Sequence, residues 1–101
     1  MKPPAGGSSE QRRLLKREVV VINKQGIHAR PAALFVKTAG KFGCDIGVEK
    51  DGENVNGKSI IGLLMLAAGQ GTKLTLIADG QDAEKALADL AKLFDDKFNE
   101  D

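Results

Sequence analysis

The stretch Gly26-Ile27-His28-Ala29-Arg30-Pro31-Ala32-Ala33 connects a polar loop to a segment with a helical pattern of apolar residues. Apolar residues after the proline recur at i, i+3, i+4 and i+7, which is the spacing of one helix face over about residues 31–39. Pro31 suits the first helical turn, where no backbone N–H is needed. His28 therefore lies at or just outside a helix N-terminus. Free N–H groups and the helix dipole favour an anion such as phosphate there.

His28 has two interpretations. It is the only histidine of the chain, and Arg30 lies two residues after it. Neutral imidazole is a good nucleophile near pH 7 and forms covalent intermediates that are easily passed on. In the first interpretation His28 accepts a phosphoryl group, and the Arg30 guanidinium and the backbone N–H groups of Ala29 and Arg30 contact the phosphate. In the second, His28 is an inert, solvated loop residue of an interaction module.

Two motifs resemble those of one protein family. GIHARPA at residues 26–32 resembles the active-site motif of HPr, the histidine-containing phosphocarrier of the bacterial sugar phosphotransferase system. NGKSIIGLLM at residues 56–65 resembles the regulatory-serine segment of the same family. The resemblance runs from about Arg17 to about Phe98 and implies an α+β fold. The expected fold is the HPr-like open-faced β-sandwich, a four-stranded antiparallel sheet with three helices on one face in the order βαββαβα.

The resemblance also implies a function and a set of partners. The chain would be a phosphocarrier rather than an enzyme, and His28 would accept its phosphoryl group from phosphorylated enzyme I and pass it to the IIA domains of sugar transporters. HPr kinase/phosphorylase would phosphorylate Ser59 with ATP. We expect a monomer without cofactor or metal. Gly57-Lys58-Ser59 lacks the earlier glycine of a phosphate-binding loop, so the chain is not expected to make its own phosphate donor.

The helical pattern that follows Ser59 is apolar on nearly every face. Serine is a favoured N-cap, and at such a position it is most often only that. A helix that is apolar all round should be fully buried, which a domain this small cannot achieve. We therefore expect an exposed docking patch beside His28. Its predicted members are Ile60, Ile61, Leu64 and Ala33; the alternative is that a loop covers these side chains.

Patterns in the remaining segments complete the predicted fold. Residues 1–16 have a disordered composition with a basic cluster, and residues 17–101 form the HPr-like domain. Strands are predicted at residues 19–22, 44–49, 53–56 and 74–79, with an Asp51-Gly52 hairpin turn between the second and third. Asp82 is expected to cap a final helix. The apolar stripe of that helix is Ala83, Ala86, Leu87, Leu90, Ala91 and Phe94.

Composition excludes several classes of protein. The 101 residues carry a net charge of +1 and four aromatic residues, all Phe, which does not indicate a nucleic-acid partner. The single cysteine, Cys44, cannot form an intrachain disulfide and is expected to be buried. No apolar stretch approaches the ~20 residues that span a bilayer. The sequence therefore predicts a cytoplasmic protein of one domain without a membrane partner.

One alternative remains within the carrier class. The loop Asn23-Lys24-x-Gly26 and the tail from Phe98 to Asp101 somewhat resemble the nitrogen branch of the system. In that branch a related phosphocarrier acts mainly in regulation. The enzyme I that phosphorylates the chain fastest distinguishes the two branches.

Overall fold

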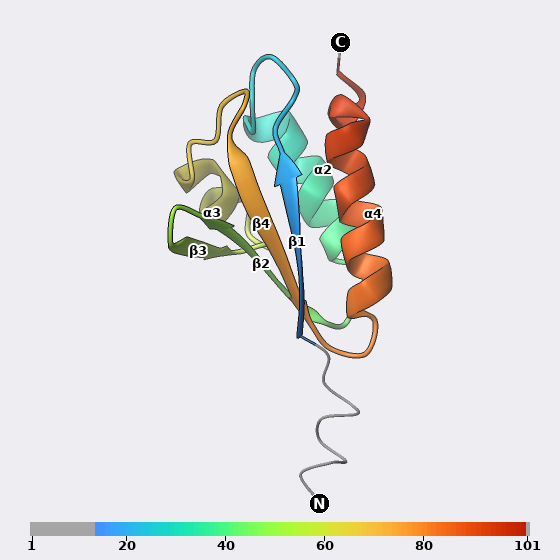
Figure 1. Cartoon of the computed structure of the whole chain (residues 1–101). Coiled ribbons are helices and arrows are strands. Elements are labelled where there is room, and N and C mark those ends of the chain that lie inside the picture. The colour runs from blue at the N-terminus through green and yellow to red at the C-terminus, as the bar shows by residue number, and fades with distance from the viewer. Residues whose placement is uncertain (1–13, 101) are drawn as a thin grey trace, which may run out of the picture.

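The computed structural model describes residues 14–100, and its elements follow the predicted order (Figure 1). The four strands form one antiparallel sheet in the order β1-β4-β2-β3. In chain order the elements are β1 (Leu14–Val20), α2 (Ala29–Ala39), β2 (Asp45–Lys50), β3 (Glu53–Asn56), α3 (Ile60–Met65), β4 (Lys73–Asp79), α4 (Ala83–Asp95) and a short turn of 3₁₀ helix, η1 (Lys97–Asn99).

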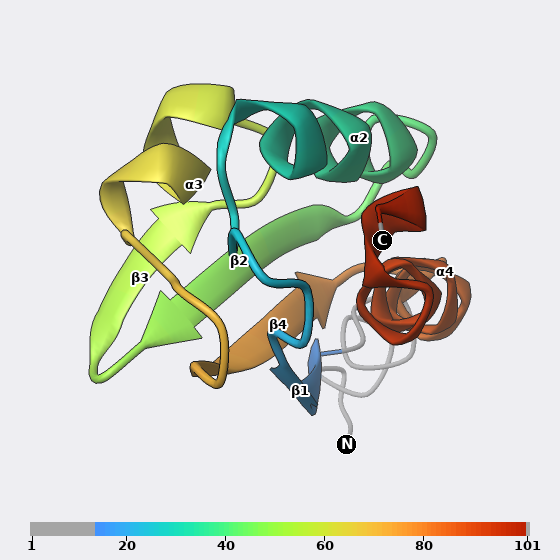
Figure 2. The same ribbon diagram turned by 90° about the horizontal axis from the view of Figure 1, so that it is seen from above.

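The three α-helices lie on one side of the sheet and leave its other face open (Figure 2). Strand residues alternate between the two faces, so Val48 and Leu76 point to the helices and are buried. All six residues of the predicted stripe on α4 are buried, which confirms that stripe. Phe94 on α4 contacts Phe35 on α2, with ring centroids 6.2 Å apart. The predicted open-faced α+β sandwich is therefore confirmed.

The first strand begins earlier than predicted. β1 spans Leu14–Val20, and all seven of its residues pair with the seven residues of β4. The prediction of a strand at residues 19–22 followed the β-branched run, but the length of the partner strand decides where pairing begins. Residues 14–16 consequently belong to the sheet, and the expectation of disorder is wrong for these three. Residues 1–13 and 101 lie outside the described residues.

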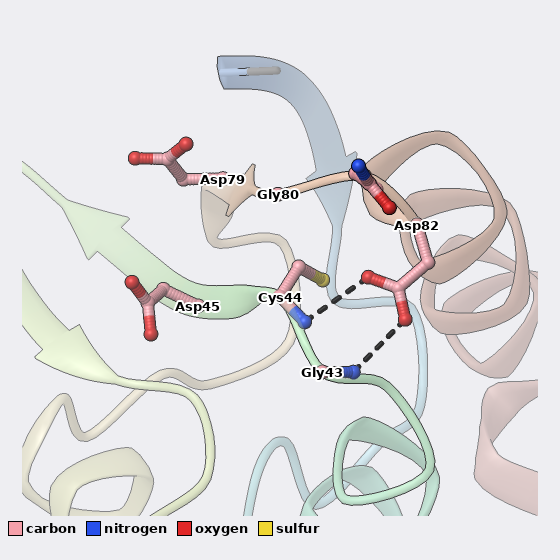
Figure 3. A pocket seen from close by; sticks show the side chains of 7 residues that line it. Gly43, Cys44, Asp45, Asp79, Gly80 and Asp82 are labelled. Carbon is pink, nitrogen blue, oxygen red and sulfur yellow. Dashed lines mark hydrogen bonds between the residues drawn. The ribbon is translucent and has the colours of Figure 1, made fainter. Parts of the chain in front are cut away.

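Asp82 occupies the N-cap position of α4, but its side chain does not cap that helix. Its carboxylate instead accepts hydrogen bonds from the backbone N–H groups of Gly43 (2.9 Å) and Cys44 (3.0 Å), as Figure 3 shows. These hydrogen bonds, that from Gly43 above all, lower the pKa of Asp82. The predicted cap is wrong because the loop before β2 offers two unpaired donors to the same carboxylate. The contact ties the start of α4 to the start of β2.

Candidate functional site

His28 stands at the N-terminus of α2, as predicted. Its backbone is extended, and its carbonyl accepts the N–H of Ala32 in the first helical turn. The preceding loop is held by Ile27, whose N–H donates to the Ala68 carbonyl at 2.9 Å. Gly26 has a φ of +70°, and a Cβ there would lie 2.4 Å from the Ala68 oxygen. Only glycine fits this close approach, so Gly26 sets the path by which the loop delivers His28.

The start of α2 has the properties of an anion site. Ala29 and Arg30 are its first two residues, and their N–H groups precede the intrahelical hydrogen-bond pattern. No acidic residue occupies the first turn of α2. Arg30 is exposed and lines a hollow on the surface together with Lys37 of α2 and with Phe98 and Asn99 near the C-terminus. Two backbone donors therefore lie at the helix start that carries His28, and the exposed Arg30 belongs to the same first turn.

A carboxylate that the sequence did not reveal faces the His28 ring. Nε2 of His28 lies 2.8 Å from Oε2 of Glu100. Oε1 of the same carboxylate accepts a hydrogen bond from Nδ2 of Asn23 at 3.1 Å. Asn23 is only 1% exposed, and its Nδ2 also donates to the Gly26 carbonyl at 2.8 Å. His28 is about one third exposed, whereas Glu100 is 16% exposed.

The backbone before Glu100 takes an unusual path. Lys97, Phe98 and Asn99 have φ values of 54°, 53° and 61°, in the left-handed region. For residues with a Cβ this conformation costs about 1–2 kcal/mol each. The Phe98 ring is buried, 4.8 Å from the Phe94 ring between centroids. Burial of this ring offsets the backbone strain, and the reversed chain brings Glu100 to His28.

Ser59 is the N-cap of α3. Its Oγ accepts the N–H of Gly62 at 3.0 Å, which confirms the predicted cap. Within α3, Leu63 alone is buried. Ile61 is 70% exposed and Met65 68% exposed, while Ile60 and Leu64 are about two fifths exposed. The expected apolar patch is therefore present, and the alternative of a covering loop is wrong.

Four exposed apolar side chains of α3, which are Ile60, Ile61, Leu64 and Met65, form the surface that is called the docking patch below, after its predicted role. Ala33 is exposed and lines the same hollow as Arg30. Met65 was not among the predicted members of the patch, although its spacing of four from Ile61 puts both side chains on one helix face. The apolar patch and His28 lie on adjoining helices, since α2 packs beside α3 (Figure 2).

A second hollow lies at the opposite end of α2, around Cys44 and three acidic residues (Figure 3). Burial, assisted by Asp82, raises the pKa of the Cys44 thiol to about 11. The thiolate is the nucleophilic form of cysteine, so Cys44 is unreactive at neutral pH. Within residues 14–100 no three side chains of His, Cys, Asp or Glu are placed so that they could hold a metal ion, and this includes the residues around the hollow. Within the same range no helix is long and apolar enough to cross a bilayer.

Comparison with known proteins agrees with this geometry. Residues 15–96 match the family model described as the PTS HPr component phosphorylation site. The chain is 51% identical to the HPr-like protein Crh of Bacillus subtilis (strain 168) over 78 residues, which are 77% of this chain and 92% of that protein. It is 43% identical to the phosphocarrier protein HPr of Xylella fastidiosa (strain 9a5c) over 88 residues, which are 87% and 99% of the two chains.

Solved structures show the same fold. The crystal structure of HPr-C-His from Thermoanaerobacter tengcongensis superimposes with a TM-score of 0.83 and 47% identity, and covers 86% of this chain and 98% of that chain. The HPr dimer from the same organism superimposes with a TM-score of 0.69 and 49% identity, over 83% and 99% of the two chains. Fold, family model and relatives agree on a phosphocarrier rather than an enzyme. The chain belongs to the HPr family of the phosphotransferase system.

Proposed function

We propose that His28 accepts a phosphoryl group from phosphorylated enzyme I and passes it to the IIA domains of sugar transporters. One observation carries this proposal: the partly exposed His28 is the N-cap of α2, and Ala29 and Arg30 are the first two residues of that helix. Their N–H groups match a phosphate that forms on the ring. The proposal places the protein in the cytoplasm.

Mass spectrometry of the intact protein tests the proposal. The protein should gain one phosphoryl group when it is incubated with enzyme I and phosphoenolpyruvate. Adding a IIA domain should then remove the group. A protein that keeps its original mass under all conditions would be an interaction module instead. Parallel reactions with the enzyme I of the sugar branch and of the nitrogen branch identify the faster donor.

Replacing Arg30 by Ala should slow phosphotransfer without unfolding the protein. Its guanidinium offers a planar pair of donors to phosphate oxygens, and hydrogen bonds to charged groups are worth about 1.5–3 kcal/mol. We therefore expect transfer to slow roughly tenfold to a hundredfold. The rate of uptake from enzyme I is the measurement. Lys37→Ala is the matched control, because it removes the same charge from the last turn of α2. Equal rates for Arg30→Ala and Lys37→Ala would contradict the role of Arg30.

Replacing Ile61 by Asp should weaken the binding of enzyme I. The side chain is 70% exposed, so the folded protein tolerates the change, whereas an apolar interface does not. The expected loss of affinity is roughly tenfold to a hundredfold, measured by titration calorimetry. Leu14→Asp makes a similar change at another exposed apolar residue, on β1. An Ile61→Asp protein that binds like Leu14→Asp would remove Ile61 from the docking surface.

We propose a monomer as the working state, because partners need free access to the docking patch. The HPr dimer of T. tengcongensis makes this a point to measure. Light scattering should give a mass of 10.7 kDa for the free chain. A mass twice as large at working concentration would contradict the proposed state.

A further inference from the structure

Lys50 extends from the sheet to the end of the helix that carries the docking patch. It is the last residue of β2 and is only partly exposed. Its Nζ donates a hydrogen bond to the carbonyl oxygen of Leu66 at 2.9 Å. Leu66 is the C-cap of α3 and is buried. The last turn of α3 contains no basic residue of its own, so Lys50 supplies the positive charge that the unpaired carbonyl groups at this end favour.

Residues 66–68, called the connector below, join the docking helix to the loop before His28. Ala67 has a φ of 52°, in the left-handed region, which ends the helical path. The carbonyl of the next residue, Ala68, accepts the N–H of Ile27 at 2.9 Å, and Ile27 directly precedes His28. The ammonium contact at the helix end therefore lies two residues from the hydrogen bond that holds the loop.

The connector depends on contacts from other elements for its position. α3 has only 6 residues, too few for a helix to be stable through its own hydrogen bonds. Among them Leu63 alone is buried, so few side chains anchor the helix in the core. A left-handed residue that ends a helix is usually glycine, because a Cβ makes this conformation costly, and here it is Ala67. Because hydrogen bonds from charged donors are among the stronger ones, the Lys50 contact is suited to hold this segment.

We propose that Lys50 is a positioning residue for phosphotransfer, which holds the connector so that the docking patch and His28 keep a fixed relative position. This inference rests on the proposed function of His28. Enzyme I contacts the patch and at the same time brings phosphorus to the ring, so both surfaces must be in register. A displacement of about 1 Å can slow such a reaction roughly a hundredfold. Lys50 acts through the Leu66 carbonyl and needs no contact with the phosphoryl group.

Lys50→Met gives the sharpest test, because methionine keeps an unbranched side chain without a hydrogen-bond donor. Hydrogen exchange measured by NMR spectroscopy reports the connector directly. We expect the Ile27 amide to exchange roughly tenfold faster than in the wild type, because its acceptor carbonyl is held less firmly. The amide of Leu76, in the central strand β4, should keep its wild-type exchange rate.

Steady-state kinetics of phosphate uptake distinguish positioning from binding. The apolar side chains of the docking patch are still present in Lys50→Met, so the KM for the chain should change by less than about twofold. We expect kcat to fall roughly tenfold, because the alignment is lost in the transition state. Lys50→Arg keeps the charge and the donors and should restore most of kcat and of the Ile27 protection. Lys85→Met removes a charge from an exposed position on α4 and should leave both unchanged.

Four results would overturn the inference and leave His28 as the acceptor. The Ile27 amide of Lys50→Met could exchange at the wild-type rate, or it could exchange faster while kcat is unchanged. A change in KM alone would make Lys50 a part of the docking surface. Faster exchange at Leu76 as much as at Ile27 would make Lys50 a residue of general stability. Phosphate uptake by a His28→Ala protein would instead overturn the proposed function, and the exchange rates remain a separate result.

Discussion

His28→Ala is expected to take up no phosphate from enzyme I. The acceptor must be a nucleophile at the start of α2, and the variant has none there. Cys44 does not replace it, because burial raises the pKa of that thiol to about 11. The Ser59 hydroxyl lies at the start of a different helix, where it accepts the N–H of Gly62. The side chain of His28 makes no capping hydrogen bond to α2, so the variant should still fold.

The measurement is radiolabel or mass uptake from phosphoenolpyruvate through enzyme I, with the melting temperature as the check on folding. His28→Gln is the matched control for polarity, since it keeps a hydrogen-bonding side chain at the N-cap and lacks a ring nitrogen. Both variants should show no detectable uptake. In the wild type the adduct should be labile to acid and stable to base. Uptake at the wild-type rate by either variant would exclude His28 as the acceptor.

Phosphorylation of Ser59 is expected to slow transfer to His28 roughly a hundredfold. The modification adds about −1.5 to −2 charge at neutral pH, next to Ile60 and Ile61 of the docking patch. At the N-terminus of α3 this charge is tolerated, because it faces the positive end of the helix dipole. Docking of enzyme I must desolvate the dianion or bring it near acidic groups. A penalty of about 2–3 kcal/mol on that step corresponds to the expected slowing.

The experiment phosphorylates Ser59 with HPr kinase/phosphorylase and ATP, and then follows the uptake of phosphate by His28. Ser59→Asp should reproduce part of the effect. Ser59→Ala should abolish it, at a cost of ~1 kcal/mol in stability from the lost cap. If the kinase ignores Ser59, or if the phosphorylated protein accepts phosphate at the wild-type rate, Ser59 is a helix cap without a regulatory role.

Local signals predicted the elements that local forces determine. The apolar spacing in α2 and α4 is a property of a single helix face, and both helices were predicted with nearly correct bounds. The turn at Asp51 and Gly52 has positive φ at both residues, as the hairpin signal requires. The start of β1 was predicted wrongly because it depends on the length of β4, which lies more than fifty residues further along the chain.

The residues of the candidate site also differ in whether the local sequence or a distant contact determines their position. His28, Arg30 and Ser59 were identified as candidate site residues because each lies at a helix start that the adjacent sequence predicts. Glu100 was missed because its contact with His28 depends on three left-handed residues and on the packing of Phe98, and no periodic pattern encodes either. Asp82 was assigned to the wrong donors for a similar reason, since the N–H groups that it accepts belong to Gly43 and Cys44 in a distant loop.

The most direct test of the account locates phosphorus on the protein. ¹⁵N-labelled chain is phosphorylated with enzyme I and phosphoenolpyruvate, and coupling between phosphorus and the ring nitrogens of His28 is then measured by NMR spectroscopy. We expect phosphorus to be bonded to Nδ1 of His28, the ring nitrogen that does not face Glu100. A protein that has gained phosphate while the His28 ring shows no bond to phosphorus would contradict the central claim.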